Sequence, residues 1–376
     1  MARKPPVVVL SSVRWDFLWQ RHQEMATQFA RAGYPTVFVE TTGLANPKIS
    51  SLKKVGARLR SGGKGRDRHD GSVVYPPLAL PPTLGIFRAA NRRFFVPRAA
   101  RDLEKIVGRR PVVVAYPPTR TTLDLISALE PRLVLYDRAD DYALFPGTPR
   151  DIRSTENELL ARADLISCTS EPLLEGARRI RPDAFLSGPA VHYERFAVLQ
   201  ERPPAVPPRT VGFFGAADRA RVDFDVFRAV LAAGFRLRLV GGLDPAERKL
   251  ADDPNVEYPG EVEHRRLPEA LDGVDAFLLP YRINGLTRAI SPAKTYECLA
   301  AGRPVVAAPL PALKGISDQI YLAESPAGFV RSLRDLGEAE TAERTAARVR
   351  LARENSWEVR FAALEARILR ALRGGS

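Results

Sequence analysis

Ser291, Lys294 and Glu297 follow one another at intervals of three residues, which places them on one side of a helix. Ser291 is a good N-cap and Pro292 suits the first helical position, so a helix is predicted to begin there. Lys294 in the first turn opposes the positive end of the helix dipole, and a bound anion would reverse the sign of that effect. Glu297 could accept hydrogen bonds from sugar hydroxyls. Alternatively, Lys294 is a solvated lysine and Glu297 a surface or capping carboxylate.

Gly215 could form a second part of such an anion site. It follows the apolar run 211–214, and a glycine after a buried strand lets the backbone approach a phosphate group closely. Arg221, a few residues further on, could add positive charge. A glycine at this point is weak evidence by itself, because any tight turn favours one.

Asp137, Asp140 and Asp141 follow another predicted strand, at the carboxyl edge where open α/β sheets place their ligands. A carboxylate there could remove a proton from a hydroxyl group, particularly where a neighbouring carboxylate raises its pKa. Asp140 or Asp141 is therefore the predicted general base, and one of the three aspartates is expected to cap a turn. As an alternative, the three could hold Mn²⁺ or Mg²⁺.

The loop after the first predicted strand carries Trp15, Trp19, Arg21 and His22. Sugars stack on aromatic faces, so these four residues are the predicted contacts to an acceptor. Alternatively, the two tryptophans anchor the core and His22 has a structural role.

Short apolar runs alternate with helical patterns along the whole chain, which predicts parallel sheets covered on both faces. Four prolines within residues 201–208 mark a boundary, after which the alternation restarts. We therefore predict an α/β protein with two Rossmann-like, doubly wound domains that face a cleft. They are expected at 1–200 and 209–356, with 201–208 as a hinge and 357–376 as a C-terminal helix.

The composition restricts the class of protein. With 376 residues, 45% hydrophobic and 27% charged, the chain has the balance of a soluble two-domain protein. No apolar run is long enough to span a membrane. Cys168 and Cys298 are isolated in apolar stretches, so no disulfide framework or zinc site is expected, and a cytoplasmic protein fits best.

The positive charge is concentrated in residues 48–110. This segment holds 16 Lys and Arg and four Asp and Glu, so it carries +12 of the chain's net charge of +13. In the second part of this segment we predict a helix that is limited by Pro97. Its aromatic side chains are expected on one side and its arginines toward the other. This profile predicts contact with an anionic membrane surface. The alternative is a helix packed on the sheet, and no nucleic-acid-binding motif accompanies the charge. The predicted membrane contacts are Phe87, Arg88, Arg92, Arg93 and Phe94.

Residues 291–307 resemble the donor-binding signature of GT-B glycosyltransferases of the family 4 type, including its Gly-x-Pro-Val-Val ending. The resemblance implies that the helix N-terminus binds a nucleotide diphosphate and that Glu297 binds the ribose. The segment 281–289, with Tyr281 and Arg288, is similar to the subset of the family that builds bacterial exopolysaccharides and teichuronic acid. The segment that contains Gly241 resembles the family's loops that frame the nucleotide base.

The resemblance implies a hexosyltransferase that moves sugar from a nucleoside-diphosphate sugar, UDP-linked, to a lipid-linked or polysaccharide acceptor. It implies no metal and no further cofactor, a cytoplasmic location on the inner face of the cell membrane, and a last helix that returns to the N-terminal domain. The family's second glutamate would fall at Ala289. Its absence favours an inverting reaction and leaves open the alternative of an inactive scaffold protein at a membrane surface.

Overall fold

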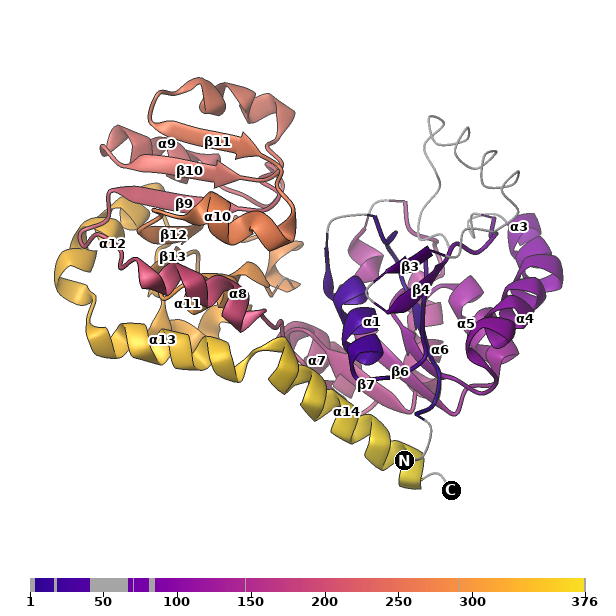
Figure 1. Ribbon diagram of the computed structural model, residues 1–376. Coiled ribbons are helices and arrows are strands. Elements are labelled where there is room, and N and C mark those ends of the chain that lie inside the picture. The colour runs from indigo at the N-terminus through magenta and orange to yellow at the C-terminus, as the bar shows by residue number, and fades with distance from the viewer. Residues whose placement is uncertain are drawn as a thin grey trace. The chain divides into compact units, whose positions relative to one another are not determined.

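The computed structural model describes residues 4–16, 19–40, 67–69, 71–80, 85–145, 147–289 and 291–374. Contacts divide the chain into two compact units: unit 1 comprises residues 1–187 and 361–376, and unit 2 comprises residues 188–360. Each unit contains one largely parallel sheet with helices on both faces (Figure 1). This confirms the predicted α/β class with two doubly wound domains.

The sheet of unit 1 has the order β3-β4-β2-β1-β5-β6-β7-β8, and every neighbouring pair is parallel except β3 and β4. Val8 and Leu10 pack toward α4 and α5, whereas Val7 and Val9 pack toward α1 and α14. Buried on both sides, such strands are apolar throughout, which explains why they were predictable. The strands are β1 (Val7–Leu10), β2 (Thr36–Val39), β3 (Asp67–His69), β4 (Ser72–Tyr75), β5 (Val112–Ala115), β6 (Leu133–Arg138), β7 (Leu165–Cys168) and β8 (Phe185–Leu186).

The helices of unit 1 include a long helical segment in which α3, a π-helical turn and α4 follow without a break. Pro97 does not limit this segment as predicted, because it lies in the first turn of α4, directly after the π-helical turn. The helical elements are α1 (Arg21–Arg31), α3 (Gly85–Ala90), the π turn (Asn91–Phe95), α4 (Val96–Val107), α5 (Arg120–Leu129), a 3₁₀ turn (Tyr142–Leu144), α6 (Ile152–Arg162) and α7 (Glu171–Arg178).

The sheet of unit 2 is parallel throughout, with the order β11-β10-β9-β12-β13-β14. One face is covered by α8, α10, α11 and α13, and the other by α9 and α12. The strands are β9 (Thr210–Phe214), β10 (Arg236–Val240), β11 (Val256–Gly260), β12 (Ala276–Leu279), β13 (Val305–Ala307) and β14 (Tyr321–Leu322). The α-helices are α8 (Tyr193–Ala197), α9 (Phe224–Ala232), α10 (Leu267–Leu271), α11 (Lys294–Ala300), α12 (Pro326–Ala339) and α13 (Ala342–Glu354). The 3₁₀ helices are Val198–Glu201, Pro245–Asp252, His264–Arg266, Thr287–Ala289 and Pro311–Gln319.

The last helix, α14 (Trp357–Gly374), begins in unit 2 and continues in unit 1, as predicted. In unit 1 the Phe361 ring meets the Phe29 ring edge to face at 4.9 Å. Glu365 accepts hydrogen bonds from the Tyr34 hydroxyl at 2.7 Å and from Lys4 Nζ at 2.8 Å. This helix is therefore part of the core of unit 1.

The division between the units differs from the predicted one. It falls at 187/188 and 360/361, so the proline-rich segment 201–208 lies inside unit 2 and does not link the units. Asp275 accepts hydrogen bonds from the backbone N–H groups of Ala205 and Arg209 at 2.8 and 2.9 Å, which fixes this segment to the start of β12. The segment is therefore an anchored connection and not the expected hinge.

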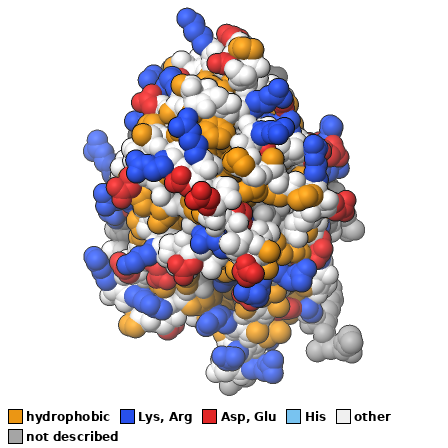
Figure 2. Space-filling model, turned by 90° about the vertical axis from the view of Figure 1, so that its left-hand side faces the viewer, with side chains coloured by type: hydrophobic (Ala, Val, Ile, Leu, Met, Phe, Trp, Pro, Cys, Tyr) orange, Lys and Arg blue, Asp and Glu red, His pale blue; other side chains and the backbone are white. Residues whose placement is uncertain are grey.

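Charges are mixed on the face of the molecule in Figure 2, where Lys and Arg alternate with Asp and Glu. The predicted concentration of charge in 48–110 is described only in part, because residues 48–66 lie outside the described residues. In the part of the chain that the structure describes, no helix is long and apolar enough to cross a membrane.

Candidate functional site

Two glycine turns meet at the carboxyl edge of the sheet in unit 2. Gly215 follows β9 with φ 99°, and Gly241 follows β10 with φ 124°. A Cβ atom on Gly241 would clash with the carbonyl oxygen of Gly215. Only glycine combines this close approach with a left-handed backbone, so the two turns form one compact backbone surface.

Lys294, the first residue of α11, extends to this surface. Its Nζ donates a hydrogen bond to the carbonyl oxygen of Phe214 and lies 4.0 Å from the centroid of the Phe213 ring. A Cβ on Gly215 would be 2.9 Å from Nζ. Among the described residues, no carboxylate forms an ion pair with Lys294. A half-buried ammonium group held against glycine turns is suited to bind an anion.

Ser291 does not cap α11 as predicted. The helix begins at Lys294 with Ala293 at the N-cap position, and no side chain caps it. The local cause is that Pro292 and Ala293 form a preceding turn, in which Thr295 N donates to the carbonyl oxygen of Pro292 at 3.0 Å. Ser291 therefore keeps only its predicted position before the helix.

Three further predicted donor contacts lie on the segments of unit 2 that follow β9 and β12. The Tyr281 ring centroid is 5.7 Å from Lys294 Nζ. Arg221 forms an ion pair with Asp218 at 2.5 Å, so its charge is already partly compensated. Arg288 is exposed on the 3₁₀ helix Thr287–Ala289. Tyr281 also lines a pocket of about 470 Å³ at the carboxyl ends of β12, β13 and β14.

Glu297 is held by two residues that the sequence did not indicate. Its Oε1 lies 2.6 Å from His264 Nε2, and His264 Nδ1 lies 2.7 Å from Arg195 Nη1. The Glu297 side chain is 12% exposed. These residues come from α11, the segment after β11, and α8. Their sequence separation leaves no spacing pattern that could have predicted the chain of contacts.

A different arrangement occurs at the carboxyl edge of the sheet in unit 1. Arg21 Nε donates to Asp137 Oδ2 at 2.7 Å, and Asp137 is fully buried at the end of β6. Ser167 also donates to Asp137, at 2.7 Å. Burial would raise the pKa of Asp137, but the charge and hydrogen bonds of Arg21, with the Ser167 hydroxyl, hold the pKa below its usual value. Asp137 is thus a paired, buried carboxylate.

His22 lies beside this ion pair. Its ring stacks on the Tyr116 ring at 3.7 Å, and its Nδ1 lies 2.9 Å from the Ser11 hydroxyl. Burial lowers the pKa of His22 to about 3, so the imidazole is neutral at pH 7. A side chain so buried can fix the loop after β1, whereas its predicted contact with an acceptor stays a prediction.

Trp15 and Trp19 contact each other and the core of unit 1. Their rings meet edge to face at 5.6 Å, and the Trp15 ring meets the Phe38 ring at 5.0 Å. Trp19 Nε1 donates to Glu24 at 2.8 Å. These contacts agree with the structural interpretation of the two rings, and the acceptor role stays a prediction.

Asp140 and Asp141 follow β6 at the same edge. Asp141 caps the turn Tyr142–Leu144, because its Oδ1 accepts a hydrogen bond from Ala143 N at 3.2 Å. Burial first, and then the nearby charge of Asp140, raise the pKa of Tyr142 well above its usual value. Within the described ranges, no cluster of three or more His, Cys, Asp or Glu could hold a metal ion.

The segment 85–107 presents only part of its predicted surface. Arg88 forms two hydrogen bonds with Asp151, at 2.7 and 3.0 Å, so it is a structural ion pair within unit 1. Arg92 and Arg93 are exposed, and the Phe94 side chain is 66% exposed. Phe87 is half-buried.

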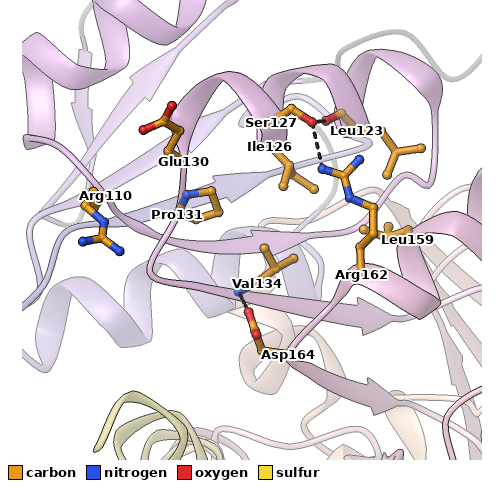
Figure 3. A pocket seen from close by; sticks show the side chains of 10 residues that line it. All are labelled: Arg110, Leu123, Ile126, Ser127, Glu130, Pro131, Val134, Leu159, Arg162 and Asp164. Atoms are coloured by element: carbon orange, nitrogen blue, oxygen red, sulfur yellow. Dashed lines mark hydrogen bonds between the residues drawn. The ribbon is translucent and has the colours of Figure 1, made fainter. Parts of the chain in front are cut away.

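A pocket of about 430 Å³ lies at the opposite end of unit 1, between α5, the start of β6 and α6 (Figure 3). Its polar groups bond one another: Arg162 donates to Ser127 at 2.8 Å, and the N–H of Val134 donates to Asp164 at 2.7 Å. Because these groups already have hydrogen-bond partners, the pocket is a weaker candidate for ligand binding than the carboxyl edges of the two sheets.

Comparisons with known proteins agree with this architecture. Residues 208–338 match the family of glycosyl transferases group 1. Over 181 residues the chain is 29% identical to a Bacillus subtilis protein named "Putative teichuronic acid biosynthesis glycosyltransferase TuaH". That match covers 43% of this chain and 44% of the relative, so the chain spans less than half the length of this curated protein.

Two solved structures have the same fold over nearly the whole chain. Sucrose-phosphate synthase from Thermosynechococcus elongatus matches with a TM-score of 0.67 and 15% identity, over 99% of this chain and 100% of that one. HepE from Anabaena, solved in complex with UDP and glucose, matches with a TM-score of 0.64 and 11% identity. The second match covers 96% of this chain and 99% of that one.

Proposed function

We propose that this protein, whose residues 208–338 match the family of glycosyl transferases group 1, is a GT-B glycosyltransferase that transfers sugar from a UDP-linked donor to a lipid-linked or polysaccharide acceptor. The UDP complex of HepE supports the choice of donor. The name of the Bacillus relative, which refers to teichuronic acid biosynthesis, supports a role in the synthesis of cell-surface glycans.

The observation that carries the proposal is the position of Lys294. The ammonium group lies against the turn at Gly215 and lacks a carboxylate partner among the described residues. A nucleoside diphosphate would bring two phosphate groups to this cation and to the backbone of the turns. Lys294, together with Arg221 or Arg288, would then stabilise the negative charge of the departing UDP without requiring a metal ion.

The reaction forms one bond and breaks one. The oxygen of an acceptor hydroxyl attacks the anomeric carbon of the donor sugar, and the bond between that carbon and the β-phosphate oxygen breaks. The bonding electrons leave with UDP, and the hydroxyl proton passes to a carboxylate. We assign this base to Asp140 or Asp141, which both follow β6 at the carboxyl edge of the sheet.

The acceptor is assigned to unit 1, where the loop after β1 carries Trp15 and Trp19 and helix α1 begins with Arg21 and His22. The segment 85–107 of the same unit would bind the anionic surface of a membrane through Arg92, Arg93 and Phe94. Such a surface would bring the enzyme to a lipid-linked acceptor on the inner face of the cell membrane.

The test is nucleotide binding measured by thermal shift, with UDP, GDP, ADP and dTDP, each with and without EDTA. Stabilisation by UDP that survives EDTA is the expected result. Stabilisation that EDTA removes would contradict metal independence and leave the donor assignment intact. If no nucleotide stabilises the protein, the enzyme assignment fails, and the inactive scaffold suggested by Ala289 becomes the better account.

A further inference from the structure

Arg195, His264 and Glu297 form a continuous chain of hydrogen bonds in unit 2. We propose that His264 and Arg195 are positioning residues that orient Glu297 toward the ribose hydroxyls, and that they thereby make the site selective for ribonucleotides. This inference rests on the proposed function, since it concerns the nucleotide part of the donor. Neither residue is assigned to the reacting atoms.

The protonation of His264 follows from its neighbours. An arginine side chain can only donate hydrogen bonds, so Nδ1 of His264 accepts from Arg195 over 2.7 Å. The proton of the neutral ring is therefore on Nε2, which donates to Glu297 Oε1 over 2.6 Å. In this tautomer the chain has one direction, from the guanidinium through the imidazole to the carboxylate.

The ring is itself held in place by its surroundings. The centroid of the buried Phe196 ring lies 5.9 Å from that of His264, and the His192 ring lies 6.4 Å away. Arg195 and Phe196 are neighbours on α8, which packs against α11. One helix thus supports the imidazole by packing and by a hydrogen bond.

The consequence for Glu297 is that one carboxylate oxygen is fixed and the other is left for a ligand. Oε1 accepts from His264, and within the described part of the chain no hydrogen bond to Oε2 is formed. A carboxylate has lone pairs for several donors, and fixing its plane reduces the entropy lost when a diol binds. A ribose offers adjacent 2′- and 3′-hydroxyls as such donors, whereas 2′-deoxyribose offers one fewer.

The experiment compares UDP with 2′-deoxy-UDP by isothermal titration calorimetry. For the wild-type protein we expect UDP to bind roughly tenfold more tightly or better, the usual size of a hydrogen bond to a charged group. His264→Leu should lose most of this preference and bind 2′-deoxy-UDP about as well as the wild type. His264→Gln should recover part of it, because its amide can both donate to Glu297 and accept from Arg195.

Arg195→Met provides a second variant that leaves His264 in place, and it should reduce the preference less than His264→Leu. Circular dichroism checks that each variant folds. A wild-type preference that both variants retain would overturn the positioning role. Equal binding of the two nucleotides by the wild type would also overturn it, while the donor assignment would stand. If the wild type binds neither nucleotide, the proposed function fails and this inference fails with it.

Discussion

Each unit has a basic side chain at the carboxyl edge of its sheet, and the two are treated in opposite ways. In unit 1, Arg21 is largely buried and paired with the fully buried Asp137, which receives a further bond from Ser167. In unit 2, Lys294 has a carbonyl oxygen and aromatic rings as neighbours and, among the described residues, no ion pair. A saturated ion pair maintains a structure, whereas a cation without a counter-ion invites an anionic ligand. The edge alone therefore does not identify a binding site; the state of its charges does.

The largest expected effect is on the stability of unit 1. Asp137→Asn removes the negative charge that faces the largely buried Arg21 guanidinium, and breaking a buried ion pair from one side typically costs about 3–5 kcal/mol. We expect the loss in chemical denaturation followed by circular dichroism. The control is the double variant Arg21→Met with Asp137→Leu, which removes both charges and should cost less. A single variant as stable as the wild type would mean that the pair is not needed.

The converse is expected at Lys294. Lys294→Ala should leave the free energy of unfolding nearly unchanged and reduce glycosyl transfer by about 10²–10³-fold, as loss of a group that stabilises developing charge does. Lys249→Ala, which removes an exposed lysine of the same unit, is the matched control. The measurement is turnover of a UDP-sugar, and wild-type turnover by the Lys294 variant would refute the donor assignment.

His22 should make unit 1 sensitive to acid. Its pKa is about 3 in the folded protein and about 6.5 in the unfolded chain, so the unfolded state binds the proton more readily. The free energy of unfolding then falls as the pH decreases from about 6.5 toward 3, by up to about 1.4 kcal/mol per pH unit. Between about pH 6.5 and 5 this amounts to roughly 2 kcal/mol. His22→Gln should have a flatter pH dependence of stability, and parallel curves for the two proteins would contradict the assignment.

The smallest effect is expected at the predicted membrane surface. Arg92→Ala and Arg93→Ala should each weaken binding to phosphatidylserine vesicles by about 1 kcal/mol at low salt. Sedimentation with the vesicles measures the binding. Arg331→Ala with Arg334→Ala removes two exposed arginines from α12 and serves as the control of equal charge. If both pairs of substitutions weaken sedimentation equally, the segment 85–107 has no special role.

The sequence predicted those features that depend on neighbouring residues. Strands such as Val112–Ala115 are apolar because both of their faces are buried. Lys294 was predicted to bind an anion because a cation is unfavourable at the start of a helix. β3 was missed because an antiparallel edge strand of three residues has no distinctive pattern. Short strand β14 was missed for a similar reason.

Features formed by distant residues could not be predicted. His264 and Arg195 contact each other only because α8 and the segment after β11 are brought together by folding. The prediction of a cap at Ser291 failed because the Ser-Pro pair is equally compatible with a turn before the helix. Likewise, Arg88 was predicted to lie on a membrane-facing surface, because its ion-pair partner Asp151 is 63 residues away in the sequence.

The helix α14 has a consequence for the order in which the protein can fold during synthesis. Phe361, Leu364 and Ile368 belong to the same core cluster as Met25 and Phe29, yet the ribosome makes them after all of unit 2. Burying such side chains contributes about 1.5–3 kcal/mol each. The first part of unit 1 is made before unit 2, but its core lacks these side chains until α14 has been made. Unit 2 can therefore be completely folded before the core of unit 1 is complete.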